Sequence, residues 1–302
     1  MNQESYGRYE KFTFGSDVLT VSVITLGATV ESLKFHGREM VLRYEDAEGY
    51  LSGSSYIGAA VGRYANRIGG ARFTLNGREY VLPANEGKNQ LHGGPRSYDK
   101  REWSAQVLSE TSVRFTLISP DGDNGFPGEL EASVTYTVEG GTLRLDFGGV
   151  CSADTVYAPT SHMYFNLGGD NVLDYSMQIP AAGWLEIDSG LIPTGRVMQP
   201  EGDFDFSVMR RLARDYDHCF TLSGEHACAV EHGGTRLDVY SDFPAVQIYT
   251  ASSMSPPHRA HCGIAIEPEA YPDSPNKPQF PSTVLRAGEH YHRRAEYRFS
   301  EI

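Results

Sequence analysis

Apolar and polar residues alternate over short stretches along most of the chain, and the apolar members are often β-branched or aromatic. A period of two places every second side chain on the same face of a strand, so this alternation is typical of sheets with one buried face. The pattern breaks after a few residues each time, which indicates many short strands. The clearest predicted strands are Val18–Val23, Val113–Leu117, Ala132–Val138, Leu143–Phe147, Arg236–Tyr240 and Val246–Thr250.

Two tight turns are predicted from their turn residues. Asn76 and Gly77 separate the apolar-polar segments Phe73–Leu75 and Arg78–Leu82, and this dipeptide supplies both positive φ values of a type I′ turn. The segment Phe35–Met40 has a His-Gly pair in the same place and predicts a second hairpin.

Helical periodicity is nearly absent, and only Asp46–Leu51 and Val208–Asp215 are weak helix candidates. The 32 glycines and 16 prolines are spread between the predicted strands, so no linker divides the chain. We therefore expect one domain over residues 1–302: an all-β, large antiparallel β-sandwich with very little helix. Turns every ~8–12 residues would give about 20 strands.

A glutamate follows directly after one fully apolar predicted strand. Ile264–Ile266 is apolar at every position, which predicts a strand covered on both faces, and Glu267 follows directly. Pro268 lacks an N–H, so we expect the ladder to stop there. A Glu held by a stiff strand in a partly dry site should have a raised pKa, suited to a general base. The alternative is a Glu that simply enters solvent at a strand end.

The charge composition limits the classes of binding partner that we expect. The formal net charge of −13, from 26 basic and 39 acidic residues, argues against nucleic acid or an anionic membrane as a partner, because both need a basic face. We expect a neutral small molecule instead. The opening MNQESYGRYEKF lacks the basic and apolar regions of a secretory signal, and no apolar run approaches membrane-spanning length.

The cysteines and histidines suggest no metal or nucleotide site. The four cysteines form no CxxC pair and fit no zinc spacing, so we expect free thiols and a cytoplasmic protein. His290 and His292 alternate without companion ligands, which favours a strand. GxSxG, HExxH, P-loop and GxGxxG patterns are absent from the sequence. We therefore expect chemistry that uses acid, base and a shaped site without a cofactor or metal.

Several polar residues are candidates for such a site. His162 precedes a Tyr-Phe pair, and a histidine in this setting can bind a ring and exchange a proton near neutral pH. His92 precedes two glycines that allow a close backbone approach. Taken one at a time, such residues are usually turn, cap or surface residues. The others are Asn66, Arg67, Asp217 and Gln247, which offer donors and acceptors to hydroxyl groups.

The motifs that contain these candidates occur in the same order as in a known protein family. Together they resemble the aldose 1-epimerases, also called galactose mutarotases. The resemblance implies a galactose-mutarotase-like β-sandwich that interconverts α and β anomers of a free aldose such as galactose or glucose, without a cofactor. It rests on GRYANRI (62–68), NQLHGG (89–94), DGDNGFPGEL (121–130), PTSHMYFNL (159–167), YDHCF (216–220), PAVQIYT (244–250) and GIAIEPEAYPDSPN (263–276).

The resemblance also implies roles. The catalytic base falls on Glu267, the catalytic acid on His162, and a second active-site histidine on His92. Neutral sugar would be held at the positions Asn66, Arg67, Asp217 and Gln247. Apart from the resemblance, the aromatic face of Tyr164 or Phe165 could stack on the apolar face of a sugar.

Two positions depart from the family pattern. Ser161 stands where Asn is common, and Glu269 stands where Gln is frequent. Two residues apart on a strand, Glu269 and Glu267 would share a face unless Pro268 disturbs the alternation. If they are close, Glu269 should raise the pKa of Glu267.

Two other functions stay open at the level of sequence. A relative acting on a phosphorylated or otherwise modified hexose would need extra cations, and Arg96, Lys100 and Arg101 follow the His92 motif. A non-catalytic sugar-binding sandwich would be expected to lack the acid or the base. Glycoside hydrolysis is less expected, because it normally uses two carboxyl groups. The partner would be a monosaccharide, and the protein a monomer or homodimer.

Overall fold

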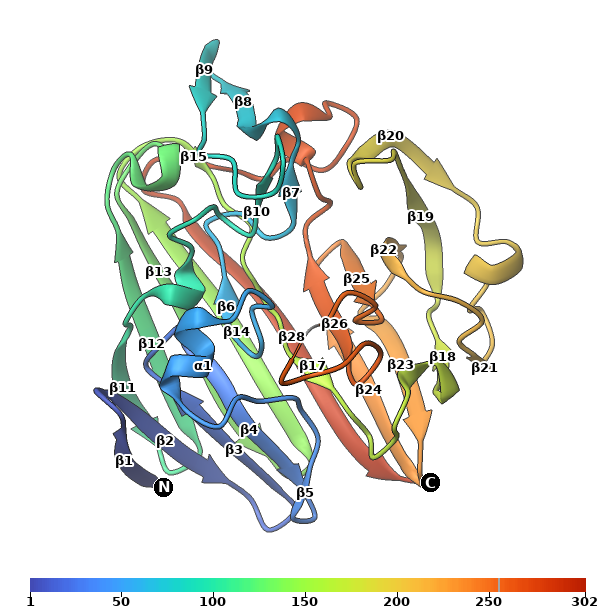
Figure 1. The fold of residues 1–302 in the computed structure, drawn as a ribbon. Helices are drawn as coiled ribbons and strands as arrows, with labels where there is room; N and C mark the ends of the chain where they lie inside the picture. Colours follow the sequence, from blue (N-terminus) through green and yellow to red (C-terminus); the bar gives the residue numbers. More distant parts are fainter. Residues whose placement is uncertain (255) are drawn as a thin grey trace.

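Strands dominate the computed structural model, which describes residues 1–254 and 256–302 (Figure 1). They run from β1 to β28, several only two residues long, so the spacing argument underestimated their number. In the described residues α1 (Ala47–Ser52) is the one α-helix. Its N-cap is Asp46, whose side chain accepts a hydrogen bond from the Gly49 N–H. The predicted all-β fold with very little helix is confirmed.

The largest sheet has nine antiparallel strands in the order β11-β12-β13-β14-β28-β24-β23-β18-β21. Its middle strands are long and alternate between buried and less buried positions, as their sequences predict. The strands are β11 (Ser104–Ser109), β12 (Ser112–Ser119), β13 (Leu130–Glu139), β14 (Thr142–Cys151), β28 (His290–Glu301), β24 (Thr235–Ser241), β23 (His226–His232), β18 (Ser176–Gln178) and β21 (Arg210–Arg211).

Two smaller sheets lie side by side in Figure 1, one blue and one mostly orange and olive. The five-stranded sheet comprises β1 (Asn2–Tyr6), β2 (Tyr9–Gly15), β3 (Leu19–Ile24), β4 (Thr29–Phe35) and β5 (Arg38–Glu39). The six-stranded sheet comprises, in spatial order, β17 (Tyr164–Phe165), β26 (Ile264–Glu269), β25 (Ala245–Tyr249), β22 (Asp217–Leu222), β19 (Ala181–Ile187) and β20 (Pro193–Met198).

Short strand pairs and single 3₁₀ turns connect these sheets. The pairs are β6 (Ala60–Val61) with β16 (Thr160–Ser161), β7 (Arg67–Ile68) with β10 (Gln90–Leu91), β8 (Arg72–Leu75) with β9 (Arg78–Val81), and β15 (Thr155–Val156) with β27 (Val284–Leu285). The turns are η1 (Gly69–Ala71), η2 (Tyr98–Lys100), η3 (Asp123–Gly125), η4 (Val172–Asp174), η5 (Gly202–Phe204) and η6 (Ser274–Asn276).

Both smaller sheets pack on the nine-stranded sheet. On one side β13 and β14 contact β2 and β3, and the Tyr136 hydroxyl donates to the Ala28 carbonyl over 2.6 Å. On the same face of the nine-stranded sheet, the Tyr297 hydroxyl of β28 donates to the Ile266 carbonyl of β26 over 3.3 Å. One buried apolar cluster draws residues from all three sheets. A shared core of this kind is what makes the layers a sandwich.

The predicted strands and hairpins are confirmed. The six alternating segments correspond to β3, β12, β13, β14, β24 and β25. Asn76 and Gly77 have φ values of 51° and 77° between β8 and β9, and His36 and Gly37 have 47° and 76° between β4 and β5. The alternating His290 and His292 lie in strand β28.

One predicted helix is right and one is wrong. The segment 46–51 contains the N-cap and all but the last residue of α1, but 208–215 holds the strand β21 and irregular chain. The backbone of Arg210 and Arg211 pairs with β18 at the end of the nine-stranded sheet. The ladder at that edge outweighs a weak local preference for helix.

Pro268 does not end its strand, so that expectation is wrong. β26 continues to Glu269 and pairs with β25 as far as Ala245. The carbonyl of Pro268 accepts a hydrogen bond from Thr160 Oγ1 over 2.7 Å, so the polar side of its backbone faces away from β25. The missing N–H therefore costs no bond to β25.

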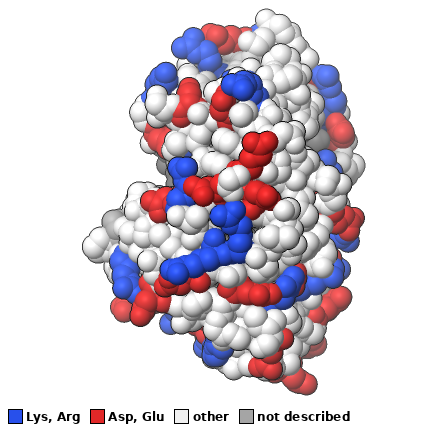
Figure 2. All heavy atoms as spheres, turned by 90° about the vertical axis from the view of Figure 1, so that its right-hand side faces the viewer, with Lys and Arg blue, Asp and Glu red and all other residues white. Residues whose placement is uncertain are grey.

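The remaining bulk expectations concern membranes, cysteines and charge. No helix among the described residues is long and apolar enough to cross a membrane. All four cysteines are buried and unpaired, as predicted. On the face shown in Figure 2, acidic and basic side chains are intermixed.

Candidate active site

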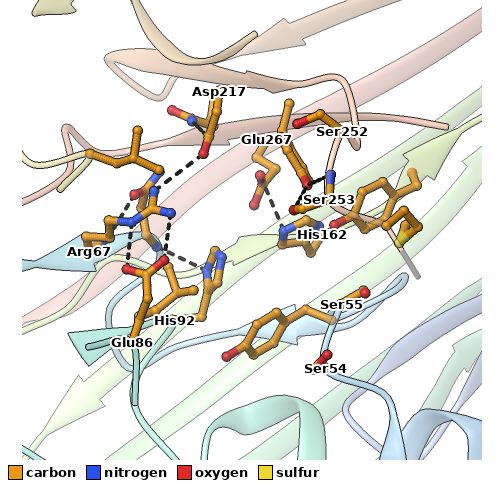
Figure 3. A pocket seen from close by; sticks show the side chains of 18 residues that line it. Ser54, Ser55, Arg67, Glu86, His92, His162, Asp217, Ser252, Ser253 and Glu267 are labelled. Atoms are coloured by element: carbon orange, nitrogen blue, oxygen red, sulfur yellow. Dashed lines mark hydrogen bonds and ion pairs between the residues drawn. The ribbon is translucent and has the colours of Figure 1, made fainter. Parts of the chain in front are cut away.

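A cleft of about 510 Å³ opens over the six-stranded sheet (Figure 3). Its floor comes from β22, β25 and β26, whose register places Asp217, Gln247 and Glu267 on one face of the sheet. Gln247 lies directly opposite Glu267 across the ladder. The walls come from β7, from the segment before it, and from the turn after β10. A cleft of this size suits a small ligand.

Glu267 and His162 face each other at the bottom of the cleft. Their Oε1 and Nε2 atoms are 3.6 Å apart, and the residues are only 2% and 4% exposed. The backbone of His162 is fixed by hydrogen bonds to Ala59 and Gly58. Its ring stacks on Tyr164, with centroids 4.7 Å apart. Glu267 is therefore held by strand β26, and His162 is held by its backbone hydrogen bonds and by the ring of Tyr164.

Burial governs the protonation of this pair. The dry site raises the pKa of Glu267 well above its ordinary value, with further increases from the charges of Glu269 and Asp217, whereas Arg67 acts in the opposite sense. Burial lowers the pKa of His162 to about 4. The resting pair thus favours a neutral imidazole, whereas the role of catalytic acid that the resemblance implies for His162 needs the imidazolium. Between these two pKa values the pair holds one proton in total.

His92 presents a hydrogen-bond donor to the cleft. Its Nδ1 accepts the backbone N–H of Asn66 over 3.1 Å, which leaves the ring hydrogen on Nε2. Burial is the main reason that the pKa of His92 lies well below its ordinary value, so the ring stays neutral. The rings of His92 and His162 are in edge contact, with centroids 5.1 Å apart.

The turn that carries His92 needs its glycine. A Cβ on Gly93 would lie 1.9 Å from the Gly62 carbonyl oxygen, and the residue has φ +87°. His92 itself has φ 50°, and its carbonyl accepts a hydrogen bond from Ser97. The backbone therefore approaches the segment before β7 more closely than any side chain would allow.

A polar network forms the opposite wall. Arg67 donates two hydrogen bonds of 2.8 Å to the carboxylate of Glu86, and its Nη1 lies 3.7 Å from Asp217 Oδ2. Gln247 donates to the other oxygen of Asp217 over 2.5 Å. The bidentate contact fixes the guanidinium plane. The network presents both donors and acceptors to a ligand.

Asn66 links this wall to the floor. Its Nδ2 donates to Glu269 Oε1 over 3.0 Å, and its Oδ1 accepts the Arg67 backbone N–H over 2.8 Å. Asn66 has φ 59°, a conformation that Asn adopts more easily than most residues. The Asn66 side chain therefore borders the cleft and at the same time holds the buried carboxyl group of Glu269.

The structure brings all seven predicted site residues to this cleft. Sequence reasoning missed Glu86, which holds Arg67, and Tyr56, whose ring lies 4.7 Å from that of His92. Both are on irregular segments without a local pattern. Phe165 was wrongly expected to contact a ligand: its ring packs against Tyr297 in the core, because neighbouring residues of a strand point to opposite faces.

A metal could in principle occupy the floor. Ligand atoms of His92, His162 and Glu267 lie within 4.8 Å of one another. The tautomer of His92 argues against coordination, because a nitrogen that carries hydrogen has no lone pair for a metal. Moving that hydrogen to Nδ1 would set it against the Asn66 N–H. The donor set therefore fits hydrogen bonding better than metal binding.

Two of the three cations after the His92 motif are used elsewhere, and the third, Arg96, is exposed and does not line the cleft. Lys100 donates to the carbonyls of Tyr50 and Gly53, and Arg101 pairs with Asp123. Of the described residues lining the cleft, only Arg67 is a Lys or Arg, and it is already paired with acids. These contacts disfavour a phosphorylated ligand.

The site and fold together define a class of protein. A β-sandwich with a polar cleft, one carboxyl–imidazole pair and several fixed donors and acceptors is suited to binding and converting a small polyhydroxylated molecule. Comparisons with known proteins agree. The aldose 1-epimerase family model matches residues 10–298. The chain belongs to the aldose 1-epimerase family.

Individual relatives cover nearly the whole chain. Galactose mutarotase from Rattus norvegicus is 39% identical, covering 97% of this chain and 95% of the relative. Aldose 1-epimerase from Escherichia coli is 34% identical over 93% and 92%. The crystal structure of galactose 1-epimerase from Lactobacillus acidophilus superimposes with a TM-score of 0.91 at 27% identity, covering 99% of this chain and 98% of that one.

Proposed function

We propose that this protein is an aldose 1-epimerase that interconverts the α and β anomers of a free aldose such as galactose or glucose. The observation that carries the proposal is the buried Glu267–His162 pair, 3.6 Å apart on the floor of a polar cleft. Anomer exchange needs a base near the C1 hydroxyl and an acid near the ring oxygen O5. The sugar gains and loses no atoms overall. One carboxyl and one imidazole supply both.

In the proposed reaction Glu267, as carboxylate, removes the proton from the C1 hydroxyl while His162, as imidazolium, protonates the ring oxygen O5. The C1–O5 bond breaks and C1 becomes an aldehyde. Rotation about C1–C2 presents the other face of the carbonyl, and the O5 hydroxyl adds to it. Its proton returns to His162, and Glu267 returns a proton to the new C1 hydroxyl. Protons and atoms balance over the cycle.

The resting and reacting forms of the pair differ only in where one proton lies. The dry site favours neutral Glu267 and neutral His162, and transfer of the proton across 3.6 Å gives the carboxylate and imidazolium. Sugar hydroxyls that donate to the carboxylate favour this charged form. Binding and activation are then coupled, because the form that reacts is the form that the ligand stabilises.

The rest of the cleft would hold the sugar. Arg67 and His92 offer N–H donors, and Asp217 offers acceptors, to hydroxyl groups away from C1. Gln247 and Asn66 complete the polar surface. The three lining carboxyl groups, of Glu86, Asp217 and Glu267, favour a neutral ligand over an anionic one. We also propose a cytoplasmic location, in keeping with four unpaired cysteines.

Polarimetry tests the activity directly. Freshly dissolved α-anomers of a panel of aldoses should approach equilibrium rotation faster with the protein than in buffer alone. A hexose 6-phosphate in the same panel should show little acceleration. If no aldose is accelerated, the protein is a sugar-binding module rather than an epimerase.

A further inference from the structure

A second carboxyl lies beside the base and has no assigned part in the reaction. Glu269 is completely buried, two residues after Glu267 on β26. Both side chains lie on the cleft side of the sheet, since β26 keeps its register with β25 through Pro268. Glu269 does not itself line the cleft, and the small residue Ala245 stands opposite it.

Glu269 is tied to the site by Asn66. The Asn66 Nδ2 group donates to Glu269 Oε1, while the backbone of Asn66 holds His92 and its Oδ1 holds the Arg67 N–H. In the described part of the chain, Oε2 of Glu269 and Oε2 of Glu267 have no hydrogen-bond partner. A buried carboxylate in this position is only partly satisfied.

Charge counting limits how many acids here can ionise. Glu86 and Asp217 already face Arg67, so the guanidinium has no spare charge for Glu267 and Glu269. Two further anions in one dry site would repel each other and lose their hydration. The titratable groups around these two carboxyls on the cleft side are His162, Tyr164 of β17, Asp217 and Cys219 of β22, and Arg67 of β7, while Tyr297 of β28 lies on the core side of β26.

We propose that Glu269 is a positioning residue for the acid–base pair: its carboxyl competes with Glu267 for one negative charge and so sets the pH range in which Glu267 acts as base. This inference rests on the proposed epimerase function. It agrees with the direction in which Glu269 and burial move the pKa of Glu267. Glu269 touches no substrate and acts only through its neighbour.

Glu269→Gln is the matched test, since the amide keeps the shape and its oxygen can still accept from Asn66. The variant should retain mutarotation, but one limb of its kcat–pH profile should move to lower pH by about one unit, as expected when a like charge beside Glu267 is removed. The other limb of the profile, which reports the protonation of His162, should keep its position on the pH axis. Cys219→Ala, a neutral change in the same buried layer, should move neither limb.

The outcomes separate the two proposals. If wild-type protein accelerates no aldose at any pH, the proposed function fails. If wild type is active and the Glu269→Gln profile coincides with it, or shifts to higher pH, the role of Glu269 is overturned.

Thermal unfolding supplies a measurement independent of catalysis. Burial raises the pKa of Glu269 in the folded protein above its ordinary 4.5, so folding stability is lost as pH rises from about 4.5 through the folded value. Glu269→Gln should therefore raise Tm by an amount that is near zero at pH 4 and grows with pH. A Tm difference that does not depend on pH would contradict a competing charge.

Discussion

At the scale of single residues, the site works through where its groups lie rather than through unusual residue types. Glu267 and His162 are chemically ordinary, but burial raises the pKa of Glu267 and lowers the pKa of His162. Arg67 is likewise fixed by its two hydrogen bonds to Glu86 and paired with Asp217. The sequence identified these three residues, but their state of ionisation depends on neighbours that come from distant segments.

Glu267→Gln should reduce kcat for mutarotation by about 10²–10⁴-fold, the usual contribution of a general base. The amide has nearly the same shape, so circular dichroism and sugar binding should change little. Glu131→Gln, an exposed position on β13, serves as the control and should keep the wild-type rate. A Glu267→Gln variant with near wild-type kcat would remove this residue from the mechanism.

Arg67→Lys should raise KM by roughly tenfold or more and leave kcat within a few-fold, because Lys keeps the charge but cannot make the forked contact to Glu86. Initial-rate polarimetry over a range of sugar concentrations separates the two constants. Arg72→Lys, at an exposed position on the neighbouring strand β8, should leave both constants unchanged. An unaltered KM in Arg67→Lys would argue against a role in sugar binding.

At the scale of elements, the floor of the site depends on register. Antiparallel pairing of β22, β25 and β26 places alternate residues of three strands on one face, and this is why Asp217, Gln247 and Glu267 meet. Sequence patterns predicted these strands individually. They predicted the end of β26 wrongly, because whether a proline interrupts a ladder depends on which neighbour its nitrogen faces.

The turn after β10 offers a sharp test of the walls. Gly93→Ala should destabilise the protein by about 2–4 kcal/mol, since the added Cβ meets the Gly62 backbone and the residue has a positive φ. Gly87→Ala, with φ +57° and open space around its Cβ, should cost only about 1–2 kcal/mol for its conformation. Urea denaturation measures both. Equal losses would mean that the close approach to Gly62 carries no weight.

At the scale of the whole molecule, one apolar core joins the three large sheets. We therefore expect the chain to unfold as a single cooperative unit. Its two tryptophans report on different parts: Trp103 lies just before β11, and Trp184 lies on β19 of the six-stranded sheet.

Single-tryptophan variants test this expectation. Trp103→Phe leaves the fluorescence of Trp184, and Trp184→Phe leaves that of Trp103. Each variant's urea transition followed by fluorescence should coincide with its own transition followed by circular dichroism. Fluorescence and circular dichroism midpoints that differ within either variant would instead reveal two units that unfold separately.

The sequence by itself determined the strands, the hairpins and the catalytic candidates, because alternation, turn residues and short motifs are local signals. It could not identify Glu86 or Tyr56, which lie on irregular segments. Nor could it exclude Phe165 from the ligand site, because the direction of that side chain depends on which face of its strand is turned to the cleft. Only the tertiary structure decided that Glu267, His162 and Glu269 are buried together near one paired arginine. Ionisation and ligand preference follow from that arrangement, since both depend on the charges and burial that distant segments impose.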